Sequence, residues 1–175
     1  KKYSCIFSKY KNAMSDKSLI NAYKKLKIKY KEYSFLQRGS DERQFNSPGI
    51  ELPVTAVFRS KFGTFKEYHT SLDDFNLVTL KGIKGSYNLM KETIINLDNM
   101  IVPRIKIMGE PFMSKYNLYD TISKKKQNVN TENIMNFLQF CDGKNDLHEI
   151  SKKIKLKQNN VKKIYNKLLK KKIIY

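Results

Sequence analysis

The pattern of apolar residues changes at Pro103, and this change limits the chain to two different kinds of folding unit. Before Pro103, short runs rich in β-branched and aromatic residues alternate with segments of helical periodicity. The predicted strands are 3–8, 30–36 and 51–58, and the predicted helices are 15–28 and 79–100. Ser15 or Asp16 is the predicted N-cap of the first helix. This alternation favours an α/β sheet domain over residues 1–103.

Two details of this half shape the expected domain. The run 51–58 is compact and apolar, and therefore predicts a buried strand. The last predicted helix is long and amphipathic, with one apolar stripe formed by Ile83, Tyr87, Met90, Ile94 and Leu97. About three strands make a thin sheet with an exposed edge, so residues 1–103 resemble the end portion of a larger domain.

After Pro103 the pattern predicts helices without a sheet. Residues 104–130 contain a Gly-Glu-Pro turn and a lysine-rich polar run, and they predict an extended connector. Three helical segments follow, the first capped by Asn130 or Thr131, and residues 173–175 predict a short terminal strand. A tight turn separates the second helix from the third. This order predicts a small winged helix-turn-helix domain over residues 131–175.

Composition bears on the compartment and on membrane association. Hydrophobic residues make up 40% of the 175 residues, which is enough for a packed core. No apolar run approaches the ~20 residues that span a bilayer, and the polar opening gives no secretory signal, so we expect a cytoplasmic protein without membrane contact. Cys5 and Cys141 lack CxxC spacing and predict reduced thiols. The absence of an initial methionine indicates a fragment, a processed chain or a trimmed one.

The formal net charge of +19 indicates nucleic-acid binding less strongly than its size suggests. Only four of the 35 basic residues are arginine, the residue that nucleic-acid readers cluster for bidentate contacts. The lysines are spread along the chain, together with abundant Asn and Ile, as an AT-biased genome would produce. Residues 1–100 carry a net charge of +8, and residues 101–175 carry +11.

The motifs with chemical content lie between Gly39 and Phe75. They are DERQF at 41–45, SPG at 47–49, LPV at 52–54, EYHTS at 67–71 and Asp74. This ordered set resembles a family of bacterial aminopeptidase-like proteins associated with polysaccharide-biosynthesis genes. The segments 109–119 and 140–151 are similar to the same family, whose C-terminus is a winged-helix module. The resemblance therefore covers nearly the whole chain.

The resemblance implies a fold like that of zinc aminopeptidases and glutaminyl cyclases. In that fold a late histidine binds the metal, and His69 occupies its place, with Thr70, Ser71, Asp73 and Asp74 available to orient the imidazole. The resemblance also implies a substrate-lining role for Asp41, Glu42, Arg43 and Tyr68. Arg43 would bind a substrate carboxylate. Glu42 stands where the enzymes have a histidine, so only the lining role carries over to it.

Other readings of these residues stay open. Arg43 and Asp41 would equally form an internal ion pair that braces their loop, and His69 taken alone is typical of an ordinary loop histidine. His148 lies on the flank of a predicted helix, which indicates a structural or surface role. No Gly-rich phosphate loop, GxSxG or HExxH motif is present, and no catalytic residue is assigned.

The resemblance places the other zinc ligands and the catalytic glutamate before Lys1. A single histidine does not retain catalytic zinc, which needs three protein ligands. We therefore expect the C-terminal part of a zinc-dependent amide hydrolase, inactive as an isolated fragment. Its expected partners are the missing N-terminal part of the same domain and a peptide or amide-containing substrate. Self-association is left open.

The alternative function is nucleic-acid binding by the winged helix. Its reading helix would be 158–171, with Asn159, Asn160, Lys162 and Lys163 outward. This reading is the less favoured one, because many winged helices only pack on a neighbouring domain and the outward face lacks arginine.

The two readings differ in how DNA binding responds to salt. If the lysines form a solvated face, binding should be weak, indifferent to sequence and lost steeply with salt, at roughly 0.9 in the log–log slope per phosphate contact. A competition titration with random duplexes at physiological ionic strength measures this. A preferred site bound at about 10⁻⁸ M, and lost on Asn160→Ala, would instead make the winged helix the functional unit.

Overall fold

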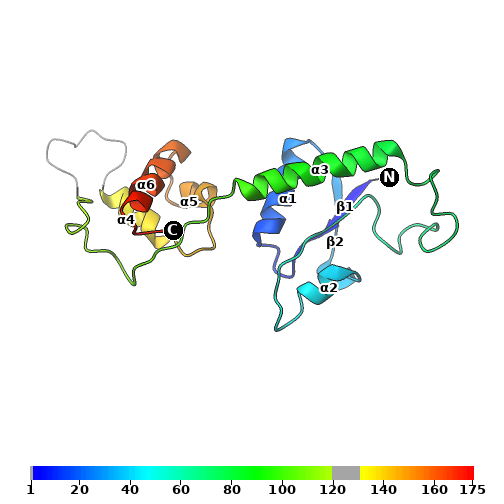
Figure 1. Ribbon diagram of the computed structural model, residues 1–175, viewed down its shortest axis with the longest axis horizontal. Coiled ribbons are helices and arrows are strands. Elements are labelled where there is room, and N and C mark those ends of the chain that lie inside the picture. The colour runs from blue at the N-terminus through cyan, green and yellow to red at the C-terminus, as the bar shows by residue number, and fades with distance from the viewer. Residues whose placement is uncertain (1, 120–130) are drawn as a thin grey trace. The chain divides into compact units, whose positions relative to one another are not determined.

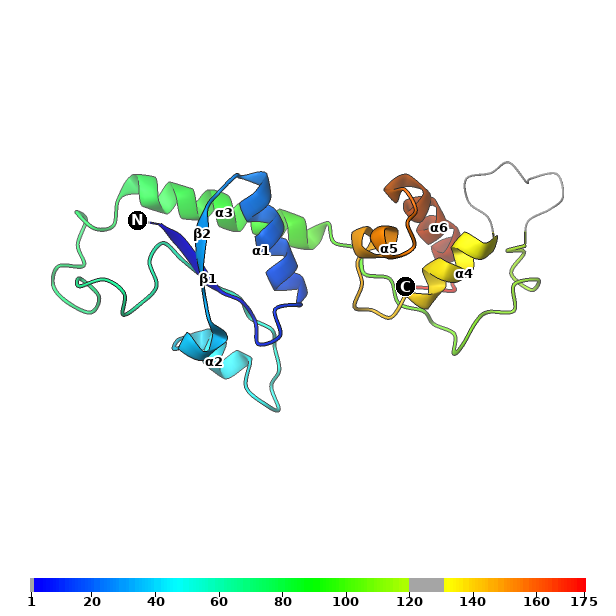
Figure 2. The same ribbon diagram turned by 180° about the vertical axis from the view of Figure 1, so that it is seen from behind.

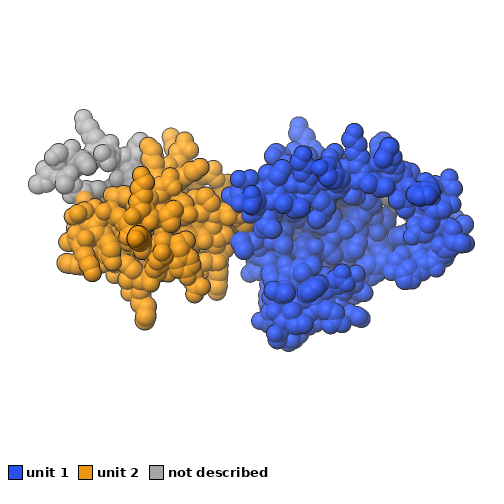
Figure 3. Space-filling view, in the orientation of Figure 1, with its two compact units in different colours: residues 1–99 blue, residues 100–175 orange. Residues whose placement is uncertain are grey.

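The computed structural model describes residues 2–119 and 131–175. The chain forms two compact units, residues 1–99 and 100–175, which Figure 3 shows in separate colours. Figures 1 and 2 show a sheet with helices in the first unit and helices joined by extended segments in the second. The architecture is thus mixed α/β, as the alternating pattern predicted.

Unit 1 is built on a three-stranded sheet. Its strands are β1 (Tyr3–Ile6), β2 (Tyr30–Tyr33) and β3 (Ala56–Phe58), in the order β2-β1-β3. β1 pairs with β2 in parallel and with β3 in antiparallel orientation. Ser4, Cys5 and Ile6 are buried, because β1 has a neighbour on each edge and helices over one face.

The strands are shorter than predicted, and the prediction of a buried strand over 51–58 is wrong for its first half. Leu52 is 53% exposed and its N–H donates to the carbonyl of Phe45, not to a neighbouring strand. Pro53 has no N–H to offer a ladder. Strand pairing therefore begins only at Ala56, and all of β3 is half-buried. The end of the predicted strand 30–36 forms a short 3₁₀ turn, Phe35–Gln37.

Three helices complete the first unit: α1 (Met14–Lys25), α2 (Asp41–Phe45) and α3 (Leu80–Asp98). α1 and α3 pack together through polar contacts. The Ser18 hydroxyl donates to the Thr93 carbonyl, and Lys25 Nζ lies 2.6 Å from a carboxylate oxygen of Glu92. Thr79 caps α3 by accepting the N–H of Gly82 at 3.1 Å. A Cβ atom on Gly85 would lie 2.5 Å from the Tyr3 hydroxyl, so a larger residue at this position would have to displace the end of the Tyr3 side chain.

The apolar stripe predicted for this helix exists, but it does not form the core of unit 1. Ile83, Tyr87, Met90, Ile94 and Leu97 are 41–63% exposed. The buried side of α3 is instead the one that carries Leu89, which is fully buried, together with Thr93 and Asn96. Small and polar side chains on this side let α1 approach closely. The amphipathic pattern of the sequence does not show which side of α3 packs against α1.

One buried carboxylate joins three segments of unit 1. Asp16 is fully buried and accepts hydrogen bonds from Ser8 N at 2.7 Å, from Ala13 N at 3.0 Å and from Thr55 Oγ1 at 2.6 Å. The Ser8 hydroxyl donates to the same carboxylate. Asp16 is not the N-cap, as one prediction had it, because the cap is Ala13. Its side chain fastens the end of β1, the start of α1 and the approach to β3.

Unit 2 contains α4 (Thr131–Gln139), α5 (Leu147–Lys153) and α6 (Gln158–Lys170). Phe137, Ile150 and Ile164 meet in its core. A capping box starts α5: Asp146 accepts the N–H of Glu149, whose carboxylate accepts the N–H of Asp146. The predicted cap residue Asn130 lies outside the described residues.

The described part of the predicted connector 104–130, residues 104–119, belongs to unit 2. Met113 and Leu118 are buried in the core of unit 2. Arg104 exchanges two backbone hydrogen bonds of 3.0 Å with Tyr175, and Ile105 N donates to the Cys141 carbonyl at 2.8 Å. The segment is therefore a central extended element of the unit, held from both sides. Residues 120–130 lie outside the described part of the chain.

No helix within residues 2–119 and 131–175 has the length and the apolar character needed to cross a bilayer.

The role of Asp16 is testable by an isosteric change. Asp16→Asn removes the charge and turns one acceptor atom into a donor that faces the donors around it, so the free energy of unfolding should fall by about 3 kcal/mol. Urea denaturation followed by circular dichroism measures the change. Asp98→Asn, at an exposed position, is the matched control and should alter stability by less than about 0.5 kcal/mol. Equal effects of both changes would contradict the role of the buried carboxylate.

Candidate functional site

Two segments of unit 1 carry the residues predicted to form a site, and an aromatic cluster joins them. The first segment is the turn before α2 and α2 itself; the second is the loop 59–79, which contains no regular helix or strand. Phe62 lies against Gly39, where an added Cβ would come within 2.8 Å of the ring. The Phe62 ring centroid lies 6.4 Å from that of Tyr68. The predicted residues of the two segments therefore belong to one region.

His69 is an exposed loop residue with an unusual backbone. Its φ is +58°, a left-handed conformation that few residues other than Gly and Asn adopt, and that costs of the order of 1 kcal/mol. Its imidazole stacks on the Tyr68 ring, with centroids 4.0 Å apart and an interplanar angle of 24°. The ring is thus held by its neighbour at the surface. Its role as a metal ligand stays a prediction.

The three consecutive charged residues of α2 have different surroundings. Asp41 and Arg43 are exposed, and no ion pair joins them within the described part of the chain. Glu42 is only 2% exposed, and its carboxylate accepts the N–H groups of Gly39 at 2.9 Å and Ser40 at 3.3 Å. The structure thus gives Glu42 a bracing role in the turn, and the substrate-lining role expected of it stays a prediction.

Two buried polar residues that sequence reasoning missed position these segments. The Asn46 amide donates to the carbonyls of Glu42 at 2.8 Å and Val54 at 3.0 Å. Lys61 is 8% exposed and its ammonium lies 3.8 Å from the Phe62 ring centroid. Asn46 directly follows the DERQF motif and precedes a turn, and this position could have indicated a structural role for it. Nothing in the sequence distinguished Lys61 from the other lysines.

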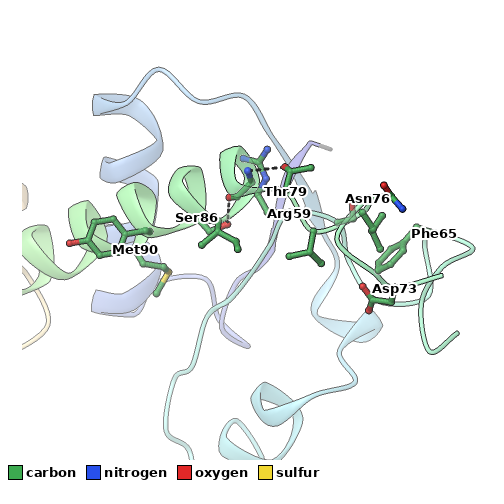
Figure 4. A pocket seen from close by; sticks show the side chains of 13 residues that line it. Arg59, Phe65, Asp73, Asn76, Thr79, Ser86 and Met90 are labelled. Carbon is green, nitrogen blue, oxygen red and sulfur yellow. Dashed lines mark hydrogen bonds between the residues drawn. The ribbon is translucent and has the colours of Figure 1, made fainter. Parts of the chain in front are cut away.

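A pocket of about 710 Å³ opens beside the first half of α3 (Figure 4). Its polar lining comes from Arg59, Asp73, Asn76, Thr79 and Ser86. Its apolar lining includes Ile83, Tyr87 and Met90 from α3 and Phe65 from the loop. Among the five predicted site residues, none lines this pocket. Asp73, expected near the histidine, does.

The described residues do not assemble a zinc site by themselves. Within residues 2–119 and 131–175, no three side chains of the types His, Cys, Asp and Glu converge to hold a metal ion. The carboxylate of Asp74 accepts hydrogen bonds from the Asn76 backbone N–H at 2.8 Å and the Asn76 side-chain amide at 3.1 Å. These bonds lower the pKa of Asp74, and the bond from the backbone N–H has the larger effect.

Because no group of three ligands forms among the described residues, His69 is at most one ligand of a larger set. These residues alone therefore support no zinc-dependent step.

The thiols and the second histidine do not provide a nucleophile. Cys5 and Cys141 are buried, and burial raises the pKa of each thiol to about 12. Both stay protonated at neutral pH, whereas a reactive cysteine needs its thiolate. His148 is exposed on α5, and its Nδ1 contacts the Gln158 side-chain amide at the start of α6. This contact fits the surface role predicted for it.

Comparison with known proteins identifies both halves of the chain. Residues 1–100 match the family described as "Domain of unknown function (DUF4910)", and residues 101–175 match a winged helix-turn-helix family. A Clostridium acetobutylicum protein, provisionally named a polysaccharide biosynthesis protein with aminopeptidase-like domain, is 32% identical over 157 residues. That match covers 89% of this chain and 36% of the relative.

A solved structure gives a concordant result. The crystal structure of a protein from Clostridium acetobutylicum, provisionally described as a peptidase, matches with a TM-score of 0.57 and 27% identity. The match covers 99% of this chain and 38% of that chain. This chain therefore spans little more than a third of either relative. The resemblance predicted from the motifs is confirmed, as is the winged helix.

The isolated chain should bind zinc weakly and without defined stoichiometry, because one imidazole supplies a single ligand where structural and catalytic sites use three or four. Isothermal titration calorimetry with zinc measures this, with His148→Ala as the matched control for His69→Ala. Tight one-to-one binding that His69→Ala abolishes and His148→Ala preserves would show that the chain does hold a complete site.

Proposed function

Because the chain belongs to the DUF4910 family over residues 1–100, we propose that it is part of an aminopeptidase-like hydrolase that cleaves amide bonds. The observation that carries this proposal is the match, over 89% of the chain, to a relative named for an aminopeptidase-like domain. The similarity to a crystal structure described as a peptidase supports the same reaction class. Both relatives are much longer, so the activity is proposed for the complete protein.

In this proposal the exposed residues of the aromatic region face the substrate. Arg43 would bind a carboxylate of the substrate through its guanidinium fork, and Asp41 would line the same surface. Tyr68 would act mainly as a positioning residue, because its ring stacks on His69 and limits the rotation of the imidazole. Glu42 would act indirectly, because its carboxylate fixes the turn from which α2 starts.

Zinc belongs to the proposal as the expected cofactor of the complete protein. His69 would then supply one ligand, and the others would come from polypeptide outside these 175 residues. The winged helix would pack against, or control access to, the hydrolase. We also propose a cytoplasmic location, in keeping with two free, buried thiols.

A second candidate function rests on the charge of unit 2. Residues 150–175 contain ten lysines and no acidic residue. On α6, Lys162 and Lys163 are exposed while Val161, Ile164 and Leu168 are buried, so the helix presents a basic face. Such a face would contact phosphates with little regard to sequence. We rank it second, because the longer relatives are named for peptidase-like domains and not for DNA binding.

A chimera tests the hydrolase proposal: this chain replaces the matched segment of the Clostridium acetobutylicum relative. The chimera should hydrolyse members of an aminoacyl-4-nitroanilide panel, whereas the isolated chain should not. His69→Ala should lower kcat/KM by about a hundredfold, since loss of a metal ligand costs more than loss of a residue that orients one.

His148→Ala, which changes the chain's other histidine, serves as the control and should leave kcat/KM unchanged. A chimera that folds but is inactive would refute the proposed activity. Full activity after His69→Ala would refute the role of the histidine.

A further inference from the structure

α3 exposes an unbroken apolar stripe to solvent. It consists of Leu80, Ile83, Tyr87, Met90, Ile94 and Leu97, whose exposed fractions range from 41% to 82%. The spacing between successive members alternates between three and four residues, which keeps all six on one side of the helix. We call this set the α3 stripe. Six large apolar side chains in register are far more than the scattered exposure of a normal surface, and mark a binding face.

The α3 stripe continues into the pocket beside it. Ile83, Tyr87 and Met90 belong to the stripe and also line the 710 Å³ pocket. Figure 4 shows the pocket along the first half of α3, with Phe65 on its far side. The surface therefore consists of the stripe and the pocket next to it. A partner that covers this surface must insert side chains into the pocket. In the loop that leads to α3, Phe75 is 91% exposed.

Within unit 1, the described residues do not cover this surface, because α3 packs on α1 with another side. Leu89, Thr93 and Asn96 are on the packed side, and Asn96 donates to the Ser18 carbonyl at 3.4 Å. The sheet also has room for a partner. In the described residues, β2 and β3 each pair only with β1, so each has one open edge.

We propose that the α3 stripe is the docking surface for the polypeptide that corresponds to the unmatched part of the longer relatives. This inference rests on the proposed function, which assigns the chain to such a hydrolase. The relatives match nearly all of this chain, α3 included, yet more than 60% of each relative lies outside the match. That additional polypeptide provides the apolar surface and the strands that the stripe, the pocket and the open edges require.

Charge disfavours a second copy of this chain as the occupant. Lys81, Lys84 and Lys91 are exposed on α3 beside the stripe, and the helix also carries the half-buried Glu92 and the exposed Asp98. Residues 1–99 carry 18 basic and 10 acidic side chains, a net charge of +8. Pairing α3 with itself would bring together two copies of a unit with this positive charge, and like charges at an interface oppose association. The occupant should instead carry Asp or Glu at the rim of its apolar surface.

The test uses the whole chain, tagged and co-expressed with the unmatched part of the Clostridium acetobutylicum relative. The two should co-purify as a one-to-one complex, with its mass read by light scattering. Tyr87→Lys should reduce the recovered complex at least about tenfold, because a lysine would be buried in the apolar pocket. Asn88→Lys introduces the same residue at the adjacent exposed position, off the stripe, and should leave the complex intact.

Circular dichroism and urea denaturation of the free chain separate docking from folding. Tyr87 is 63% exposed, so Tyr87→Lys should unfold at the same urea concentration as the unmodified chain. The inference is overturned if the unmodified chain recovers no soluble partner, if Asn88→Lys disrupts the complex equally, or if the free chain forms a dimer that Tyr87→Lys dissociates. Complex formation without hydrolysis would leave the docking surface standing and remove the proposed activity.

Discussion

The buried carboxylate of Asp16 is the contact on which unit 1 depends. A charged group without water is tolerated only when its hydrogen-bonding capacity is used, and here four donors from three segments provide this. The donors belong to Ser8 and Ala13, on either side of the turn between β1 and α1, and to Thr55, about forty residues further along the chain. These hydrogen bonds therefore fix the end of β1 and the segment that enters β3. The bonds also set the direction in which the chain leaves β1 and enters β3, and so the place of α2 and its loop.

The arrangement of the candidate site follows from that geometry. Asn46 ties α2 to the segment before β3, and Phe62 brings the loop after β3 back to Gly39. The site region is thus built from irregular segments fixed by a few buried polar groups. Such segments hold functional residues accurately only when every buried polar group finds a partner. The stack of His69 on Tyr68 lies at the end of this series of contacts.

The longer helices of both units could be predicted because their apolar residues repeat with a clear period, whereas the five-residue α2 was not predicted. The winged helix and the relationship to aminopeptidase-like proteins were also accessible, since turns, caps and ordered motifs are local features. The side of α3 that packs against α1 could not be predicted. Thr93 and Asn96 pack inward while Tyr87 faces solvent, against the usual preference of polar and aromatic residues. The roles of Asp16 and Glu42 were missed for a related reason. Acidic residues near turns normally read as caps or surface groups, and only long-range contacts reveal that these are buried.

The pairing of Arg104 with Tyr175 has a consequence for the order of folding. The extended segment at the start of unit 2 is held between Cys141 and the residues 173–175, so its last partner is made about seventy residues later. These backbone hydrogen bonds join residues about seventy positions apart, so they form only after Tyr175 has been made and is free to fold back. The extended segment at 104–106 therefore closes late in the folding of unit 2, after the local turns of its helices.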